Sequence, residues 1–165
     1  MVKPIPDGYH TVTATLVLND TAKAIDFYKR AFGAKENMRS VHGGKVAHAE
    51  IQIGDSRIML HDEWPGTSVR SPQSLGGASS SQWLYVKDVD QMFNQAVQAG
   101  AKVAMPLTNQ FWGDRFGSVT DPFGHVWSLA THIEDVTPQE LEKRAKEAMA
   151  KMSQGGSQQG GASGA

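Results

Sequence analysis

An internal repeat constrains the fold of this chain more than any other feature of its sequence. The tripeptide Gly-Ala-Lys occurs at residues 33–35 and again at 100–102, an offset of 67 residues, and each copy ends a segment with helical periodicity. Short alternating segments close the two halves, and pairing Met59 with Ser128 in them gives an offset of 69. The two offsets agree within one small insertion, which indicates two copies of one structural module.

Each copy contains the same order of predicted elements. An alternating strand at residues 11–18 or 81–86 comes first, a helix follows, and two or three short strands complete the copy. We therefore predict two β-α-β-β-β modules, at residues 9–64 and 79–132. Residues 65–78 are rich in Ser, Gly and Pro, and we interpret them as the linker between the modules.

The helix inside each module carries recognisable start and stop signals. Asp20 and Asp88 precede the two helices, and Asp is a residue that caps helix N-termini. Gly33 and Gly100 end them, since glycine adopts the left-handed conformation that closes a helix.

A third helix is predicted after the second module, at residues 137–152. Thr137 and Glu140 form a capping box, with Pro138 at the first helical position. One narrow stripe of this helix is apolar, and it consists of Leu141, Ala145, Ala148, Met149 and Met152. Such a stripe is equally consistent with packing on its own domain and with contact to another subunit. Residues 153–165 contain only Gly, Ser, Gln and Ala, a composition that predicts a flexible tail.

Alternation along the strands separates two faces of each predicted sheet. One face is apolar and requires the helix, whereas the other mixes small, polar and aromatic side chains. A solvated face would not carry Trp83, Tyr85 and Met59, so we predict a partly enclosed concave surface that binds a small molecule. The candidate ligand contacts are His48, Glu50, Met59, Trp83, Tyr85, Trp112, Phe116 and Ser128.

Composition excludes several classes of protein. The 16 Lys and Arg residues balance 17 Asp and Glu residues, which gives no electrostatic reason to expect nucleic acid or an anionic membrane as a partner. The chain has no cysteine, which excludes disulfides, thiolate metal sites and cysteine nucleophiles. No apolar run reaches the length of a membrane span, and the N-terminal residues do not resemble a signal peptide. We expect a soluble, cytoplasmic protein.

Several motifs resemble the vicinal oxygen chelate superfamily, the group of glyoxalase I, bleomycin-resistance proteins and extradiol dioxygenases. One is Ala-Ile-Asp-Phe-Tyr at 24–28 followed by Phe-Gly-Ala at 32–34. Residues 48–55, 111–117 and 121–127 are similar to its PhnB-like branch. The resemblance implies an α+β domain over residues 9–134 in which paired modules form a cupped, incomplete barrel, usually in a homodimer.

The resemblance also places the positions at which metal enzymes of this superfamily hold a divalent ion. These positions fall on Thr13, Met59, Ser81 and Ser128, with Gln82 as the alternative to Ser81. Hydroxyl and thioether groups do not assemble a site for Zn, Ni, Mn or Fe, which prefer imidazole and carboxylate. We therefore expect neither a metal nor another cofactor.

Two local alternatives stay open. His48, Glu50 and His61 face the same concavity and could share an ion, although we favour ordinary hydrogen bonding for them. Residues 111–117 fit either a hairpin with core aromatics or a loop that stacks on a planar ligand.

Three functions follow from these observations. The favoured one is metal-independent binding of a small, planar or aromatic molecule in the cup of a homodimer. The second is a metal-dependent lyase or isomerase of glyoxalase type, and in an enzyme Glu50 is the best catalytic candidate. The third is a non-catalytic assembly partner that uses the helix at 137–152.

Overall fold

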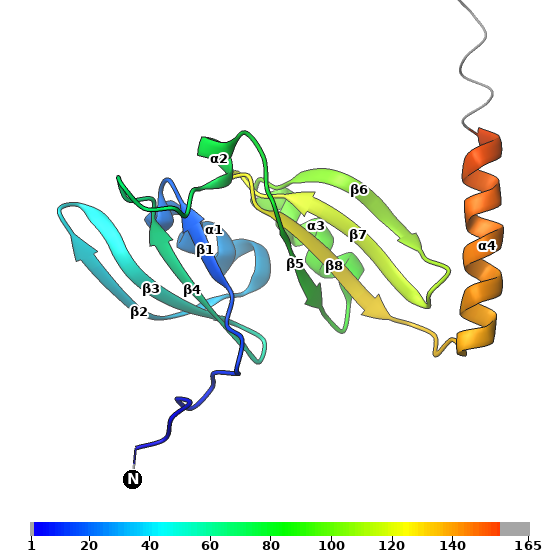
Figure 1. The fold of residues 1–165 in the computed structure, drawn as a ribbon, viewed down its shortest axis with the longest axis horizontal. Helices are drawn as coiled ribbons and strands as arrows, with labels where there is room; N and C mark the ends of the chain where they lie inside the picture. The colour runs from blue at the N-terminus through cyan, green and yellow to red at the C-terminus, as the bar shows by residue number, and fades with distance from the viewer. Residues whose placement is uncertain (1, 156–165) are drawn as a thin grey trace, which may run out of the picture.

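The computed structural model describes residues 2–155, which form two four-stranded sheets with accompanying helices (Figure 1). The first module contains β1 (Thr15–Leu18), α1 (Thr21–Phe32), β2 (Lys35–His42), β3 (Lys45–Ile53) and β4 (Ser56–Asp62). The second contains β5 (Ser81–Tyr85), α3 (Val89–Ala99), β6 (Lys102–Asn109), β7 (Asp114–Thr120) and β8 (Val126–His132). A short helix, α2 (Pro72–Leu75), lies between the modules, and α4 (Pro138–Gly155) follows the second. The predicted pair of β-α-β-β-β modules is confirmed.

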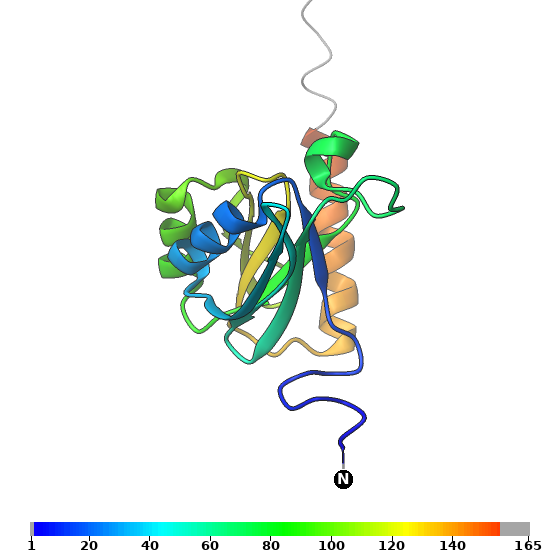
Figure 2. The same ribbon diagram turned by 90° about the vertical axis from the view of Figure 1, so that its left-hand side faces the viewer.

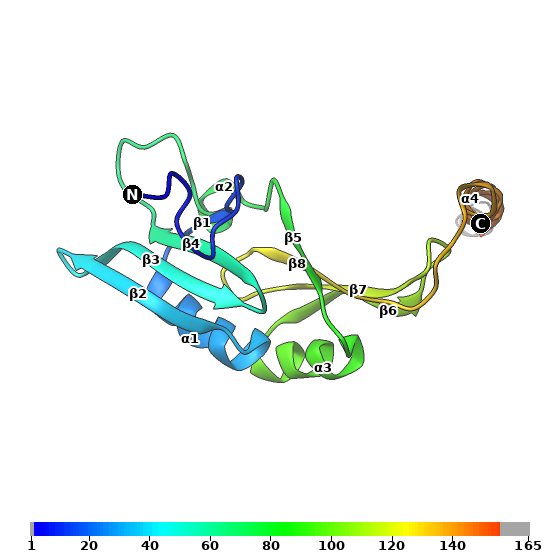
Figure 3. The ribbon, with the colours of Figure 1, turned by 90° about the horizontal axis from the view of Figure 1, so that it is seen from below.

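The two sheets have the same topology. Their strand orders are β1-β4-β3-β2 and β5-β8-β7-β6, with the first strand of each module parallel to the last. The sheets lie side by side with α1 and α3 packed together beneath them, so they form an open arrangement and not a closed barrel (Figure 3). Each sheet therefore has one face covered by helix and one open face.

Burial follows the predicted alternation closely. Leu16 and Leu60 in the first sheet and Leu129 in the second face the helices and are at most 2% exposed. Burying each such side chain contributes roughly 1.5–3 kcal/mol to stability. On the open face of the second sheet, Trp83 and Tyr85 remain 47% and 61% exposed. The assignment of these two aromatic residues to the open face is thus confirmed.

The first strand is shorter than predicted. β1 begins at Thr15, whereas the alternating pattern begins at residue 11. The Thr13 hydroxyl donates to the carbonyl of His10 at 3.4 Å, so the chain turns locally before it enters the sheet. The preceding residues run over the open side of the first module.

The helix caps agree with the sequence signals. The Asp20 carboxylate accepts from the backbone N–H of Lys23 at 3.1 Å, and Asp88 accepts from Gln91 at 2.9 Å. Gly33 ends α1 with φ of 65°, a left-handed conformation that strains any residue with a Cβ atom.

The C-terminal helix stands apart from the helices of the modules. α4 lies on the opposite side of the sheets from α1 and α3, beyond the β6–β7 hairpin (Figures 1 and 2). Arg144 on α4 holds it through paired hydrogen bonds of 2.7 and 2.8 Å to Glu134. α4 continues to Gly155, past the predicted end at 152, and residues 156–165 of the predicted tail lie outside the described residues. No helix within residues 2–155 is long and apolar enough to cross a membrane.

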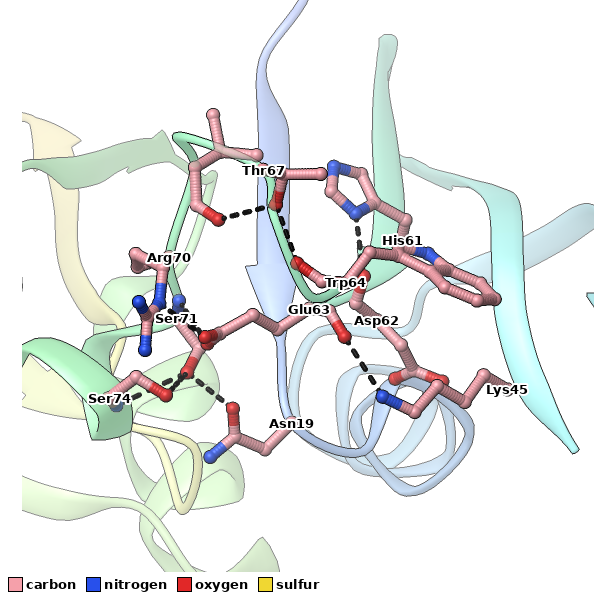
Figure 4. Close-up of polar contacts among 11 residues, drawn as sticks. Asn19, Lys45, His61, Asp62, Glu63, Trp64, Thr67, Arg70, Ser71 and Ser74 are labelled. Atoms are coloured by element: carbon pink, nitrogen blue, oxygen red, sulfur yellow. Dashed lines mark hydrogen bonds and ion pairs between the residues drawn. The ribbon is translucent and has the colours of Figure 1, made fainter.

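The segment between the modules is anchored, which its composition did not predict. The Glu63 carboxylate accepts hydrogen bonds from the backbone N–H of Ser71 at 2.9 Å and from the Arg70 guanidinium (Figure 4). The fully buried Ser71 hydroxyl donates to Asn19 at the end of the first strand. The N–H of Ser71, with the hydroxyls of Ser74 and Ser71, lowers the pKa of Glu63 to about 2.

A buried carboxylate joins the two modules. Asp121 is 4% exposed, and one of its oxygens accepts from the backbone N–H groups of Phe123 and His125, each at 2.9 Å. The other accepts from the Tyr28 hydroxyl of α1 at 2.7 Å and from the Trp127 indole N–H at 3.0 Å. One buried side chain therefore links α1 to the second sheet, beside the direct packing of Phe32 on Trp127 with ring centroids 4.6 Å apart.

We expect Asp121→Ala to destabilise the protein by about 3–5 kcal/mol, because it leaves the Tyr28 hydroxyl and the Trp127 N–H buried without an acceptor. Tyr28→Phe removes one donor only and should cost about 1–2 kcal/mol. Urea unfolding measures both. The exposed carboxylate of Asp55 provides a control, since Asp55→Ala should change stability by less than about 0.5 kcal/mol. Equal effects of all three substitutions would contradict the role of Asp121.

Candidate functional site

The open face of the first sheet borders a cavity of about 390 Å³. The N-terminal segment forms one wall of this cavity, with Pro4, Ile5 and Tyr9 among its residues, and Glu50 and Met59 line the sheet side. Two predicted contacts, Glu50 and Met59, therefore lie together at the edge of a cavity. This volume lies within the usual range of roughly 300–1,000 Å³ for small-molecule pockets.

Glu50 is the charged centre of this first face. His48 Nε2 lies 3.3 Å from one of its oxygens, and Arg57 Nη1 lies 3.8 Å from the other. The Tyr9 hydroxyl is the largest influence that lowers the pKa of Glu50, and His48 acts in the same direction, because both stabilise the carboxylate anion. An ionised Glu50 with these neighbours is suited to accept hydrogen bonds and is a weak base.

Tyr9 and Arg57 join this face although neither was among the predicted contacts. The Arg57 guanidinium stacks over the Tyr9 ring, 4.9 Å from its centroid. Strand alternation placed Arg57 on the open face, but Tyr9 precedes every strand and no local pattern marks it. Its position results from the path of the N-terminal segment over the sheet.

His61 does not join His48 and Glu50. Its Nδ1 lies 2.9 Å from the carbonyl oxygen of Asp62, and the side chain points toward the anchored loop (Figure 4). Within the described residues, no group of three or more His, Cys, Asp or Glu side chains is placed to hold a metal ion.

The open face of the second sheet carries an aromatic cluster. The Trp83 and Phe116 rings stack with centroids 4.9 Å apart and an interplanar angle of 20°, and Trp112 meets Phe116 edge-on at 5.9 Å. Tyr85 lies 5.9 Å from Trp83. Phe116 and Ser128 are each only 6% exposed, so they form the floor beneath the more exposed rings. The four predicted aromatic contacts are therefore brought together by β5, β7 and the turn before β7.

A second buried carboxylate lies beneath these rings. Asp114 accepts hydrogen bonds from the Tyr85 hydroxyl at 2.9 Å, the Trp112 indole N–H at 3.0 Å and His132 Nδ1 at 2.8 Å. Burial raises the pKa of Asp114, but the hydrogen bonds from these three groups outweigh it and the net change is downward. The other ring nitrogen of His132 lies 3.0 Å from Asp135. Sequence patterns gave no sign of this network, because its members are separated by up to fifty residues.

The two faces approach each other at Trp83. A further cavity of about 290 Å³ at the junction of the modules is lined by Trp83 from the second module and by Tyr9, Thr13 and Arg57 from the first. The predicted contacts thus occupy two neighbouring faces of one chain, with Trp83 at their border, and do not line one closed cup.

The positions that the superfamily uses for metal ions do not suit a metal in this chain. Thr13, Met59, Ser81 and Ser128 offer hydroxyl and thioether groups, and the Thr13 hydroxyl is directed at a backbone carbonyl. Gln82 lies on the opposite face of its strand from Trp83 and pairs with Trp127. This donor set lacks the imidazole and carboxylate ligands that transition metals require.

A separate cavity of about 400 Å³ lies beside the anchored loop, whose residues are drawn in Figure 4. Lys45, Glu63, Trp64 and Arg70 line it. Lys45 donates to the carbonyl of Glu63 at 3.1 Å and lies 5.5 Å from the centroid of the Trp64 ring. These contacts hold the loop on the first module.

Comparison with known proteins identifies the family. Residues 10–129 match the sequence profile of the Glyoxalase/Bleomycin resistance protein/Dioxygenase superfamily. The chain belongs to this superfamily. An uncharacterised protein of Mycobacterium tuberculosis is 46% identical to this superfamily member over 132 residues, which are 77% of each chain.

Solved structures agree with this assignment. The crystal structure of an Arabidopsis thaliana gene product is 30% identical, with a TM-score of 0.60 over 74% of this chain and 98% of that chain. A PhnB protein from Bacillus cereus, 20% identical, has a TM-score of 0.58 over 74% of this chain and 99% of that chain. The second likeness is one of fold alone, and it agrees with the fold expected from the resemblance.

We expect the His132 contacts to make stability depend on pH in a defined direction. Asp135 and then Asp114 raise the pKa of His132, so the stabilisation should be complete below the unfolded value of about 6.5 and disappear as the pH rises through the folded value. Urea unfolding of wild type and His132→Gln across this range measures the difference.

The exposed His42 on β2 supplies the control for this measurement, because His42→Gln removes a histidine without touching the network. If the free energy of unfolding of the wild type, relative to that of His132→Gln, increased as the pH rises, the stabilising role of protonated His132 would be wrong.

Proposed function

We propose that this superfamily member binds a small planar or aromatic molecule on its open faces, with Trp83 as the central contact and without a bound metal. The observation that carries the proposal is the exposure of the Trp83 indole. It is 47% exposed, stacked on Phe116 from below, and it lines the cavity at the junction of the modules. A large aromatic surface held rigidly beside a cavity is suited to stacking on a flat ligand.

The polar groups of the first face support the same function. Glu50 and Arg57 offer an acceptor and a donor at the edge of the ligand, while Met59 offers an adaptable apolar contact. A few oriented polar groups beside apolar surface fix the orientation of a bound molecule.

The alternatives fit the site less well. A glyoxalase-type lyase needs a metal that polarises adjacent oxygens, and the residues at the family's metal positions do not supply ligands for it. Glu50, the best catalytic candidate, has a lowered pKa, which reduces its strength as a proton acceptor. A role as an assembly partner alone does not account for the exposed aromatic side chains of the second open face.

A second copy of the chain is the partner that would enclose the ligand. The edge strands β2 and β6 expose apolar side chains, with Val41 at 56%, Val103 at 51% and Met105 at 50%. Exposed apolar edges are normally covered by another element or another chain. In a homodimer, the first face of one copy and the second face of the other can surround one ligand.

We expect light scattering at tens of micromolar to give the mass of a dimer, because enclosing the ligand needs the first face of one copy and the second face of the other. Replacing an exposed edge residue, as in Val103→Lys, should shift the equilibrium toward monomer. The exposed Val2 lies in the N-terminal segment, away from the sheet edges, so Val2→Lys is the matched control. A wild-type monomer under these conditions would contradict the homodimer.

The role of Trp83 is tested by a pair of neighbouring substitutions with acridine, a neutral three-ring molecule, as the probe. Trp83→Ala should weaken acridine binding about ten-fold or more, since stacking on an indole contributes roughly 1–2 kcal/mol. Leu84→Ala should instead cost about 2 kcal/mol of stability, because Leu84 packs against the helix-covered core. Calorimetric titration and urea unfolding measure the two effects.

Acridine should also raise the melting temperature of the wild type, because binding to the folded state alone stabilises it. If acridine binding is absent, or if both substitutions leave its affinity unchanged, the binding function on this face is wrong.

A further inference from the structure

The second open face combines exposed aromatic rings with a carboxylate buried directly beneath them. Asp114 is 2% exposed, yet the ring of Tyr85, whose hydroxyl it accepts, is 61% exposed. Trp112 donates to the same carboxylate oxygen at 3.0 Å. The rings that would contact a ligand are therefore fixed to a negative charge on the side away from solvent.

The hydrogen-bond donors of these rings point inward. Both the hydroxyl of Tyr85 and the indole N–H of Trp112 are directed at Asp114. A ligand on this face would meet ring surfaces and would find these two donors already engaged. An anionic ligand, which needs donors, gains little here, whereas the negative ring faces attract a cation.

The charge near the rings stays negative in both protonation states of His132. His132 lies between Asp114 at 2.8 Å and Asp135 at 3.0 Å, so even its protonated form leaves one carboxylate charge uncompensated. Arg115 follows Asp114 on β7, but its side chain is directed to the helix-covered side, where it pairs with Asp90 of α3 at 2.6 Å. Across the junction of the modules, Arg57 also lines the cavity at Trp83, but Glu50 lies 3.8 Å from its guanidinium and offsets its charge.

We propose that this face selects planar aromatic cations over neutral and anionic molecules of the same shape. The inference rests on the proposed binding function and adds the chemical class of the ligand to it. Asp114 acts as a positioning residue, since it orients Tyr85 and Trp112, and as the source of the selecting charge. A protonated nitrogen heterocycle over these rings would gain both cation–π attraction and the field of the carboxylates.

Three probes of nearly equal shape separate ring stacking from charge. At about pH 7.5 and low salt, 9-aminoacridine is a cation, acridine is neutral and acridine-9-carboxylate is an anion. Calorimetric titration of the full-length protein should give affinities in that order, with the cation at least about five-fold tighter than acridine.

Asp114→Asn keeps an acceptor oxygen and removes the charge. We expect it to abolish the preference for the cation, which is measured as the ratio of the 9-aminoacridine affinity to the acridine affinity within the same variant. Asp26→Asn removes the same charge from the exposed side of α1 and should leave the preference intact. The pair therefore separates a local charge from a change in net charge.

Folding of each variant is checked by its melting temperature, because Asp114 also holds two rings. If Asp114→Asn does not fold, the wild type provides the test through ionic strength. Raising the salt concentration to about 0.5 M screens the carboxylate field, so it should reduce the preference for 9-aminoacridine and leave acridine affinity unchanged.

The possible results distinguish the two proposals. Equal affinities for all three probes, or tightest binding of the anion, would overturn the selection of cations. If Trp83→Ala still abolishes the binding of each probe, the binding function itself stays in place. A preference that survives both Asp114→Asn and high salt would overturn the selection of cations as well. Absence of binding by every probe would overturn the binding function itself.

Discussion

The arrangement of this protein depends on the buried carboxylate of Asp121. A charge removed from water is stable only when donors surround it, and Asp121 has four, two from its own turn and two from aromatic side chains. Because Tyr28 belongs to the first module and Trp127 to the second, the solvation of one charge fixes how the modules meet. This contact, together with the packing of α1 on α3, holds the sheets side by side and places Trp83 at their border.

The same contact explains which features could be predicted from the sequence. Two of the motifs that carry the resemblance to the superfamily, at residues 24–34 and 121–127, contain the residues that donate to Asp121. Module order, helix caps and strand faces are local or periodic properties, and the sequence predicted them correctly except at residues 11–14, which precede β1. These motifs specify the joining of modules, so they identify the fold and carry little information about the ligand.

The parts that sequence analysis missed depend on contacts between distant elements. Tyr9 contacts Arg57 and lines the same cavity as Glu50 because the N-terminal segment turns back over the sheet. The linker is anchored because the Glu63 carboxylate accepts hydrogen bonds from Ser71 and Arg70. Neither contact produces a periodic pattern in the sequence. The candidate contacts lie on the open faces, and their division between two faces of one chain follows from the packing of α1 on α3.

Asp114 and Asp121 have similar hydrogen-bond donors but lie in opposite surroundings. Each accepts from a tyrosine hydroxyl and a tryptophan N–H. Asp121 completes its shell with backbone N–H groups that carry no charge and never titrate, and its aromatic partners are buried. Asp114 completes its shell with His132, whose side chain is 53% exposed, and its partner Tyr85 opens to solvent. The first arrangement closes a core, whereas the second keeps a negative charge within reach of whatever occupies the open face.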